Sequence, residues 1–443
     1  MHNLAIALKQ KGYTVTGSDD EIFEPSKSRL AFHGLLPEKS GWHPEKITED
    51  IDTVILGMHA KEDNPELVKA KAIGIDIKSF PEYLYEQTKE KKRIIVAGSH
   101  GKTTVTAMIM HVLKALGMKF DYMVGSMIEG FDTMVGLSND SEYAVFEGDE
   151  YLTSPIDRRP KFHLYMPDIA IINGIAWDHM NVFPTFENYV DQFRIFINKI
   201  TDGGTLLYCD TDPVVRDLAV ESSKKIDKIP YRVHPYVQEG EIPYLKADNK
   251  KIPVKLFGEH NMQNISAAKY ACRAIGIKDA DFYDAISGFS GTAKRLQKIA
   301  GNDYGTAYLD FAHSPSKVKA TVEAVVARYP HSDVIACLEL HTYSSLNSSF
   351  LPQYKGTLER ADYSYVYYSN HALELKKLPP ISKIDVKKGF DDEKVSVYDD
   401  AEQLFMDIKA KKFIKPVFLF MSSGSFDGQN ITKLAEELLN CNL

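Results

Sequence analysis

The sequence has few cysteines and no long apolar run, and both absences narrow the class of protein. Its 443 residues include only four cysteines, which are widely separated and form no C-x-x-C pair: Cys209, Cys272, Cys337 and Cys441. This usage argues against a disulfide framework or a zinc site and favours reduced thiols in a cytosol. No apolar stretch approaches the roughly 20 residues of a membrane span, and residues 4–8 are too short for a signal-peptide core. We therefore expect a cytoplasmic protein with no membrane partner.

The charge balance narrows the partners further. Asp and Glu number 61 against 53 Lys and Arg, which gives a formal net charge of −8. This balance argues against general binding to nucleic acid, although a local basic pocket for phosphates remains compatible with it. We expect small-molecule substrates and a monomer or homodimer. A chain of 443 residues exceeds what one core usually organises, so we expect two or three domains.

A glycine-bearing loop between an apolar strand and a helix is the most informative segment. Residues 94–106 read IIVAGSHGKTTVT. Backbone N–H groups at Gly98, Gly101 and the helix start can converge on phosphate oxygens, because glycine admits the required φ values and a helix N-terminus favours an anion. Lys102 would place its charge near the β and γ phosphates, and the Thr103 hydroxyl would ligate Mg²⁺. The loop is shorter than the standard phosphate-loop spacing, and an ordinary glycine turn is the alternative.

Residues 1–88 predict a doubly wound α/β domain. We expect a helix over residues 3–11, strands at 14–17 and 53–57, and a helix from Asn64. Asp19 follows the first of these strands, where such folds place an acid against a sugar hydroxyl, although a solvated turn is equally compatible. The domain begins at a helix, so we expect either a start codon assigned too late or the loss of a first strand.

The rest of the chain predicts two further α/β units, over residues 89–297 and 298–443. The charged residues 89–93 are expected to form a solvated linker. In the second unit we expect strands at 143–146 and 169–173, a hairpin-like region at 205–208 and a helix from Asn261. In the third we expect strands at 307–311, 334–338, 363–368 and 417–421, and a helix at 316–327.

Acidic and imidazole side chains follow the predicted strands of the second unit. Glu147 ends one strand and suits Mg²⁺, which prefers carboxylate oxygens, and Asp149 and Glu150 follow it as outer partners. An exposed acidic turn is the alternative. His179 follows the next strand and is a candidate ligand for a second Mg²⁺, with Asp178 to orient it, or else a structural histidine.

Other polar groups lie near the predicted boundary with the third unit. His260 and Asn264 are four residues apart and share one face of a helix, where an amide can bind an adenine edge, and Asn261 is expected to cap that helix. Arg295 can turn toward phosphates or belong to a charged linker. Two more groups follow strands of the third unit: Asp310 with His313, and the glycine turn at 422–426.

Together these segments resemble the Mur ligase family, ATP-dependent amide-forming enzymes of peptidoglycan synthesis, over essentially the whole chain. The motifs that carry the resemblance are GSHGKTT, EGDE, DH at 178–179, GEHNMQN and DFAH, in the family's order. The resemblance implies three domains: a Rossmann-like N-terminal domain without its first strand, a central P-loop ATPase-like domain and a C-terminal Rossmann-like domain. It implies ATP and Mg²⁺ as cofactors, and catalysis by Lys102, Glu147 and His179. The implied metal ligands are Thr103, Glu147 and His179, and the implied nucleotide contacts are Gly98, Ser99, His100, Gly101, Lys102, Thr103, Thr104, His260, Asn264, Arg295 and Asp310.

Within the family the chain looks most like the branch that attaches a peptide to UDP-N-acetylmuramate through an acyl phosphate, with the branch that adds L-alanine as the alternative. The implied substrate contacts are Asp19, Arg158, Arg159, His313 and His341. Residues 340–345, LHTYSS, resemble the alanine-adding branch's proline-histidine-threonine-tyrosine-serine-arginine stretch but lack its proline and its arginine. A folate polyglutamate ligase is disfavoured by the N-terminal domain. A nucleotide-dependent binding protein whose catalysis has lapsed is the alternative outside enzymes.

Overall fold

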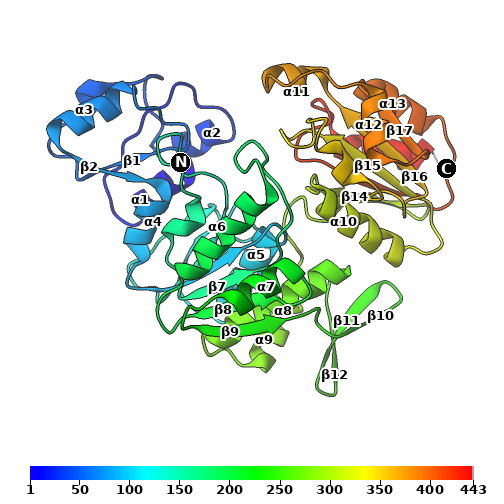
Figure 1. Cartoon of the computed structure of the whole chain (residues 1–443), viewed down its shortest axis with the longest axis horizontal. Coiled ribbons are helices and arrows are strands. Elements are labelled where there is room, and N and C mark those ends of the chain that lie inside the picture. The colour runs from blue at the N-terminus through cyan, green and yellow to red at the C-terminus, as the bar shows by residue number, and fades with distance from the viewer. Residues whose placement is uncertain (442–443) are drawn as a thin grey trace. The chain divides into compact units, whose positions relative to one another are not determined.

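The computed structural model describes residues 1–441 and divides into two compact units, which we describe separately (Figure 1). Unit 1 comprises Met1–Ile175, Val190–Arg232 and Ala267–Ile286. Unit 2 comprises Ala176–Tyr189, Val233–Ser266 and Ser287–Leu443. Two helices contribute residues to both units: α6 (Phe186–Asn198) and α8 (Glu259–Ala274).

Unit 1 contains a seven-stranded sheet in the order β5-β4-β6-β3-β7-β8-β9. Its neighbouring strands are parallel except β4 and β5. The sheet strands are β3 (Lys92–Ala97), β4 (Phe120–Met123), β5 (Val135–Gly136), β6 (Tyr143–Glu147), β7 (Ile169–Ile172), β8 (Thr205–Cys209) and β9 (Asp227–Tyr231). The helices around them are α5 (Lys102–Ala115), α7 (Pro213–Glu221), α9 (Asp279–Ile286) and the 3₁₀ segment η2 (Lys161–Leu164). A parallel sheet is expected for strands as apolar as β3 and β7, since helices cover both faces.

The N-terminal part of unit 1 has its own small parallel sheet of β1 (Thr53–Leu56) and β2 (Asp76–Ser79). Its other elements are α1 (His2–Gln10), α2 (Ser26–Phe32), η1 (Pro44–Lys46), α3 (Pro65–Ile73) and α4 (Phe80–Thr88). The Ser79 hydroxyl and the Glu82 carboxylate form a capping box at the start of α4, which fixes where this helix begins. The mixed α/β fold predicted from the sequence is confirmed.

Three local predictions are wrong. Residues 14–17 are not a strand, because no neighbouring strand pairs with them and Thr14 is exposed. Residues 205–208 belong to β8, which lies between β7 and β9 and pairs in parallel with both, and not to a hairpin. Residues 89–93 are not a solvated linker: Arg93 is the second residue of β3, is only 4% exposed and donates hydrogen bonds to the carbonyls of Thr88, Tyr165 and Met166.

Unit 2 contains a six-stranded sheet in the order β13-β14-β18-β15-β16-β17. The strands are β13 (Gln297–Gly301), β14 (Thr306–Asp310), β15 (Val334–Leu340), β16 (Tyr363–Tyr368), β17 (Val395–Tyr398) and β18 (Val417–Met421). The helices are α10 (Pro315–Arg328), α11 (Asn370–Leu375), α12 (Lys383–Phe390), α13 (Ala401–Lys409), α14 (Ile431–Cys441) and the 3₁₀ segment η3 (Leu351–Tyr354). A separate antiparallel sheet is formed by β10 (Tyr236–Glu239), β11 (Ile242–Ala247) and β12 (Lys250–Pro253).

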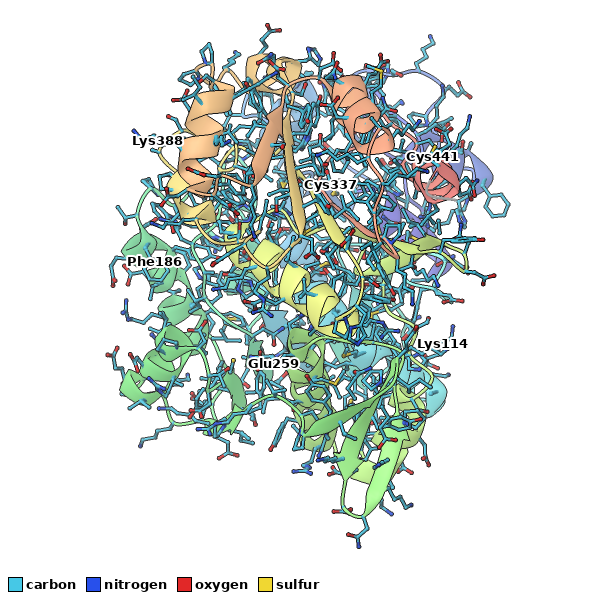
Figure 2. All side chains as sticks on the ribbon, turned by 90° about the vertical axis from the view of Figure 1, so that its right-hand side faces the viewer. Lys114, Phe186, Glu259, Cys337, Lys388 and Cys441 are labelled. Atoms are coloured by element: carbon cyan, nitrogen blue, oxygen red, sulfur yellow. The ribbon has the colours of Figure 1, made fainter. Side chains whose placement is uncertain are left out.

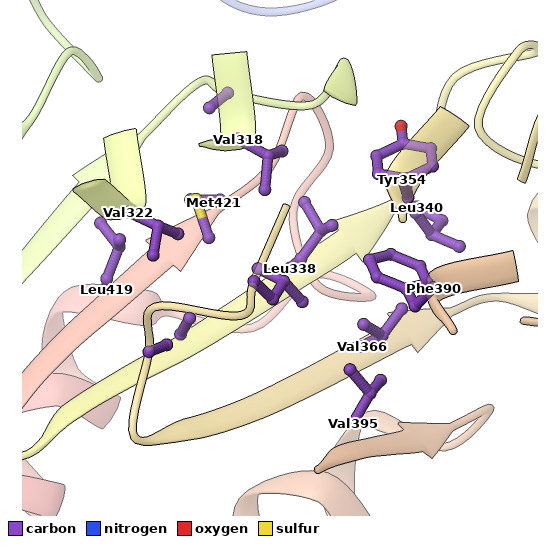
Figure 3. Packing of buried hydrophobic residues seen from close by; sticks show 14 of the residues in the cluster. Val318, Val322, Leu338, Leu340, Tyr354, Val366, Phe390, Val395, Leu419 and Met421 are labelled. Carbon is purple, nitrogen blue, oxygen red and sulfur yellow. The ribbon is translucent and has the colours of Figure 1, made fainter. Parts of the chain in front are cut away.

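The six-stranded sheet is buried on both faces because its strands are apolar at successive positions. Along β15, Leu338 joins one hydrophobic cluster while Cys337 joins the cluster on the opposite face, as the two-residue repeat of a strand requires. Figure 3 shows Val322 of α10 beside Leu419 of β18 in the first cluster.

The cysteines agree with the reduced state expected from the sequence. All four are free thiols, and Cys209, Cys272 and Cys337 are buried while Cys441 is exposed. Figure 2 labels Cys337 on its strand and Cys441 on the terminal helix. No helix among the described residues is long and apolar enough to cross a membrane.

Candidate functional site

The glycine loop connects β3, near the centre of the unit 1 sheet, to the buried helix α5. Gly98 has φ 114° and Gly101 has φ 66°, and both values favour glycine over residues with a side chain. Gly101 is the N-cap of α5, and no side chain caps this helix. The amide groups at the start of α5 are thus unblocked by a capping side chain, which is what an anion at a helix N-terminus requires.

Residues that follow β7 form hydrogen bonds with the glycine loop. The Ser99 amide donates to the Gly174 carbonyl at 2.8 Å, and the Asn173 side-chain amide donates to the His100 carbonyl at 3.1 Å. Tyr231 fixes that amide in turn, because its hydroxyl donates to Asn173 Oδ1 at 2.6 Å. Asn173 was not among the predicted site residues, although its position directly after a buried strand is a signal for a residue near the site.

Glu147 stands at the carboxyl end of β6, next to the glycine loop. Its Oε1 accepts a hydrogen bond from the Thr103 hydroxyl at 3.0 Å, and its Oε2 accepts one from the Gly125 amide at 2.7 Å. A Cβ at Gly125 would lie 3.0 Å from Glu147 Oε2, so the carboxylate needs a glycine there. The predicted neighbours Thr103 and Glu147 therefore bring one hydroxyl and one carboxylate together beside the helix N-terminus.

Lys102 and Glu150 form a buried ion pair on the same side of the sheet. Lys102 Nζ lies 2.6 Å from Glu150 Oε2 and donates to the Gly98 carbonyl at 2.8 Å. Burial lowers the pKa of Lys102, but the carboxylates of Glu150 and Asp149 outweigh burial and raise it above its ordinary value. Lys102 is therefore a permanent positive charge at the glycine loop.

The oxygen donors of this loop fit Mg²⁺. Thr103 and Glu147 supply hard oxygen ligands of the kind that Mg²⁺ takes together with water and phosphate. Within residues 1–441, no group of three or more His, Cys, Asp and Glu side chains is arranged to hold a metal ion. Thr103 and Glu147 are the protein groups that would hold Mg²⁺ here, with phosphate oxygens and water as its other ligands.

Unit 2 holds the remaining predicted nucleotide contacts. Burial lowers the pKa of His260, and the nearby Asp310 carboxylate opposes that change. Asp310 ends β14 and accepts hydrogen bonds from the amides of Leu296 at 2.6 Å and Ala312 at 2.7 Å. A Cβ at Gly258 would lie 3.0 Å from the His260 ring, so the ring occupies the space that this glycine leaves. Asp310 is thus close enough to His260 to act on its charge, and the role of both residues as nucleotide contacts stays a prediction.

One prediction for this helix is wrong. Asn261 does not cap α8, because the helix begins two residues earlier at Glu259. Instead the Asn261 side chain donates to the Phe257 carbonyl at 2.8 Å and accepts from Asn264 Nδ2 at 3.4 Å.

Arg295, another predicted nucleotide contact, places its guanidinium 4.7 Å from the centre of the Phe311 ring, a cation–π geometry.

Asp178, His179, His313 and Lys317 form a charged cluster in unit 2. Asp178 is buried, and its Oδ2 lies 3.7 Å from Lys317 Nζ and 3.9 Å from His313 Nε2. Burial raises the pKa of Asp178, but the charges of His179 and Lys317 outweigh burial and lower it to about 2. Burial lowers the pKa of His313 to about 3. His179 has φ 56°, an uncommon value for a residue with a side chain. His179 and the pair Lys102 and Glu147 belong to different units.

A buried carboxylate that sequence reasoning missed lies beside His341. Glu339 Oε1 is 3.6 Å from His341 Nδ1, and Oε2 accepts hydrogen bonds from the Ser422 hydroxyl and from the Phe426 amide at 2.8 Å. Burial raises the pKa of Glu339, but His341, together with the hydrogen bonds from Ser422 and Phe426, outweighs burial and lowers it. A Cβ at Gly424 would lie 2.7 Å from His341 Nδ1, which explains the glycine in the turn at 422–426. These residues lie at and just beyond the carboxyl ends of β15 and β18, where the strand order of the sheet changes direction and ligands commonly bind.

The predicted substrate contacts of unit 1 lie on its surface. Asp19 and Arg158 are exposed. Arg159 is held by two acids, because its guanidinium lies 2.7 Å from Asp157 Oδ2 and 2.8 Å from Glu82 Oε1. These contacts use Nε and Nη2 of Arg159, and the contact with Glu82 links α4 to the loop before η2. The role of Arg159 as a substrate contact stays a prediction.

The family follows from comparison with known proteins. Residues 1–92 match the family model described as Mur ligase family, catalytic domain, and residues 96–272 match the Mur ligase middle domain. The chain belongs to the Mur ligase family, and it is an ATP-dependent, ADP-forming amide ligase of peptidoglycan synthesis.

Two relatives with similar sequences are both named as L-alanine ligases. The chain is 31% identical over 359 residues to the UDP-N-acetylmuramate–L-alanine ligase of Carboxydothermus hydrogenoformans, covering 78% of this chain and 74% of the relative. It is 30% identical to the corresponding ligase of Limosilactobacillus reuteri, covering 83% and 82%.

Among solved structures, the chain is similar to a murein peptide ligase from Psychrobacter arcticus, with a TM-score of 0.65 at 22% identity. The match covers 99% of this chain and 96% of that structure. It is also similar to the UDP-N-acetylmuramate–alanine ligase from Thermotoga maritima, with a TM-score of 0.68 at 18% identity. That match covers 99% of this chain and 95% of that structure. These two likenesses confirm the fold.

Proposed function

We propose that the chain joins the carboxyl group of UDP-N-acetylmuramate to the free amine of the peptide L-alanyl-γ-D-glutamyl-meso-diaminopimelate. The observation that carries the ligase chemistry is the arrangement of Lys102, Thr103 and Glu147 around the glycine loop. We further propose that each predicted domain binds one substrate: residues 1–88 bind the UDP-sugar, residues 89–297 bind ATP, and residues 298–443 bind the peptide.

The reaction would begin with attack of the muramyl carboxylate on the γ-phosphate of ATP, because a free carboxylate is a poor acyl donor. The bond from the γ-phosphorus to the bridging oxygen breaks, ADP leaves, and an acyl phosphate is formed. Amides at Gly98, Gly101 and the start of α5 would hold the phosphates, and Lys102 would offset the charge that spreads over the transferred phosphoryl group. Bound Mg²⁺ supplies Lewis-acid stabilisation of the same oxygens. The peptide amine then attacks the acyl phosphate carbonyl, and the tetrahedral intermediate expels phosphate.

A peptide acceptor is supported by the structure around Ser345. This residue stands where the motif of the alanine-adding branch has an arginine, and it is fully buried. Its amide donates to Thr342 Oγ1 at 3.1 Å and its hydroxyl donates to the Thr342 carbonyl at 3.1 Å, so it closes a turn. The position thus offers no guanidinium to bind an amino-acid carboxylate in a bidentate manner.

L-alanine is the second candidate acceptor. It is favoured by the two curated relatives, which are named as L-alanine ligases. Residues 341–344, HTYS, also keep the central part of that branch's motif.

An acceptor panel tests the proposal. Purified protein with ATP, Mg²⁺ and UDP-N-acetylmuramate is given L-alanine, L-alanyl-γ-D-glutamate or the tripeptide, and ADP and the mass of the product are measured. We expect the highest kcat/KM for the tripeptide and no ADP formation by Lys102→Ala. A preference for L-alanine would contradict the peptide assignment and support the second candidate. ADP formation by none of the mixtures would favour a binding protein without catalysis.

A further inference from the structure

The acidic residues of the loop after β6 have separate partners, although they are almost adjacent in sequence. Glu147 binds the Thr103 hydroxyl and the Gly125 amide. Asp149 pairs with Lys161 at 2.6 Å. Only Glu150 of this loop lies within hydrogen-bond distance of Lys102 Nζ among the described contacts. Glu147 is therefore the carboxylate placed to bind a metal ion, whereas Glu150 is the carboxylate that holds Lys102.

The Lys102 side chain is held from two directions. Its ammonium donates to the Gly98 carbonyl at 2.8 Å, at the start of the loop, and to Glu150 Oε2 at 2.6 Å. An ammonium has three N–H donors, so these two bonds leave capacity for one phosphate oxygen. Glu150 is 1% exposed, and burying a carboxylate away from water costs free energy that its contact with the Lys102 ammonium offsets.

We propose that Glu150 is a positioning residue that holds the Lys102 ammonium at the glycine loop. In this position the ammonium stabilises the phosphoryl group while it is transferred, more than it stabilises the phosphates of bound ATP before transfer. The inference rests on the proposed function, because it assumes that ATP binds at this loop. A nearby negative charge also weakens ground-state binding of the triphosphate. Interactions that favour the transition state over the ground state raise kcat.

Kinetics of Glu150→Gln test this positioning. Gln has the shape of Glu but lacks its charge, so Lys102 is no longer held by an ion pair. We expect kcat to fall on the order of tenfold or more while KM for ATP stays constant or falls, the pattern of a lost transition-state interaction. A kcat within about twofold of wild type, or a rise in KM for ATP with kcat unchanged, would overturn the inference.

Asp121→Asn is the matched control for a loss of stability. Asp121 is a fully buried carboxylate in the same unit and also lies 2.6 Å from a lysine, Lys91. Its replacement removes a buried ion pair of the same length on β4, away from the glycine loop. We expect Asp121→Asn to lower the melting temperature without the change in the ratio of kcat to KM expected for Glu150→Gln. Equal kinetic changes in both variants would assign Glu150 a purely structural role and overturn the inference.

Chemical labelling gives a readout that does not require turnover. The rate at which acetic anhydride acetylates Lys102 at pH 8.5 is measured by mass spectrometry, with and without a non-hydrolysable ATP analogue. Without Glu150 the Lys102 amine loses its ion-pair partner and is held less firmly at the Gly98 carbonyl, so we expect it to be labelled faster in Glu150→Gln than in wild type. Equal rates would contradict the inference. If wild type forms no ADP with any acceptor, the proposed function fails, while faster labelling of Glu150→Gln still shows that Glu150 controls Lys102.

Discussion

Gly98 is the position where one added methyl group should damage the site most. Its φ of 114° is outside the range that residues with a side chain adopt easily, and a Cβ there would lie 2.8 Å from the Asn173 amide nitrogen and 3.0 Å from the Gly174 carbonyl oxygen. Both neighbours are backbone atoms at the end of a buried strand, so neither can turn aside as a flexible side chain would. Gly98→Ala must therefore displace the glycine loop itself.

The magnitude follows from backbone strain and steric overlap. A left-handed conformation costs a residue with a side chain about 1–2 kcal/mol, and overlap with two fixed backbone atoms adds to this, so we expect a loss of about 2–4 kcal/mol in the free energy of unfolding. Because the loop moves, affinity for ATP should fall on the order of a hundredfold.

Gly117→Ala is the control for this prediction. Gly117 follows α5, has φ 67°, and a Cβ there would meet no atom within 4 Å. We expect this variant to lose only about 1 kcal/mol and to bind ATP normally. Denaturant unfolding followed by circular dichroism measures the stabilities, and calorimetric titration measures ATP affinity. Equal stability of the two variants with unchanged ATP affinity would refute the reasoning from the loop geometry.

Three further predictions concern other parts of unit 1. Burial lowers the pKa of His163 from 6.5 to about 4, so its ring stays neutral in the folded protein and the stability present above pH 6.5 falls as pH drops toward 4. Its share of the loss is about 2 kcal/mol at pH 5, and His163→Gln should remove that part of the pH dependence of unfolding. Asp212 caps α7 by accepting from the Val215 amide, so Asp212→Ala should cost about 1–2 kcal/mol in thermal unfolding, and an unchanged melting temperature would contradict this role. Glu147→Gln should raise the Mg²⁺ concentration for half-maximal ADP formation on the order of tenfold or more, which a titration of ADP release with Mg²⁺ measures; an unchanged requirement would remove Glu147 from the metal ligands.

Local sequence patterns predicted those parts of the fold that depend on short segments. The apolar residues before Gly98 form β3, and Lys102 begins α5. Residues 363–368 form β16 with the predicted bounds. These elements are fixed by strand propensity, glycine conformation and helix initiation within a few residues of sequence.

Predictions failed where a residue's surroundings come from distant segments. The charged residues before β3 suggested a linker, yet Arg93 is buried because the carbonyls of Tyr165 and Met166 accept its hydrogen bonds. Glu339 lies in an apolar strand, and nothing near it in sequence shows that Ser422 and Phe426 will bind its carboxylate. A buried charge is stable only with such partners, so its role can be recognised only when the fold brings them together.

The EGDE motif shows why adjacent residues of one type can have different functions. The sequence suggested one acidic cluster around a metal, with Glu147 inside and Glu150 outside it. In the structure the two carboxylates bind different residues, Thr103 and Lys102, which are themselves adjacent at the start of α5. Two glutamates three residues apart, one at the end of β6 and one in the loop after it, thus contact two neighbouring positions of a helix. Removing the charge of Glu147 should therefore change the requirement for Mg²⁺, whereas removing that of Glu150 should change how Lys102 acts on the phosphoryl group.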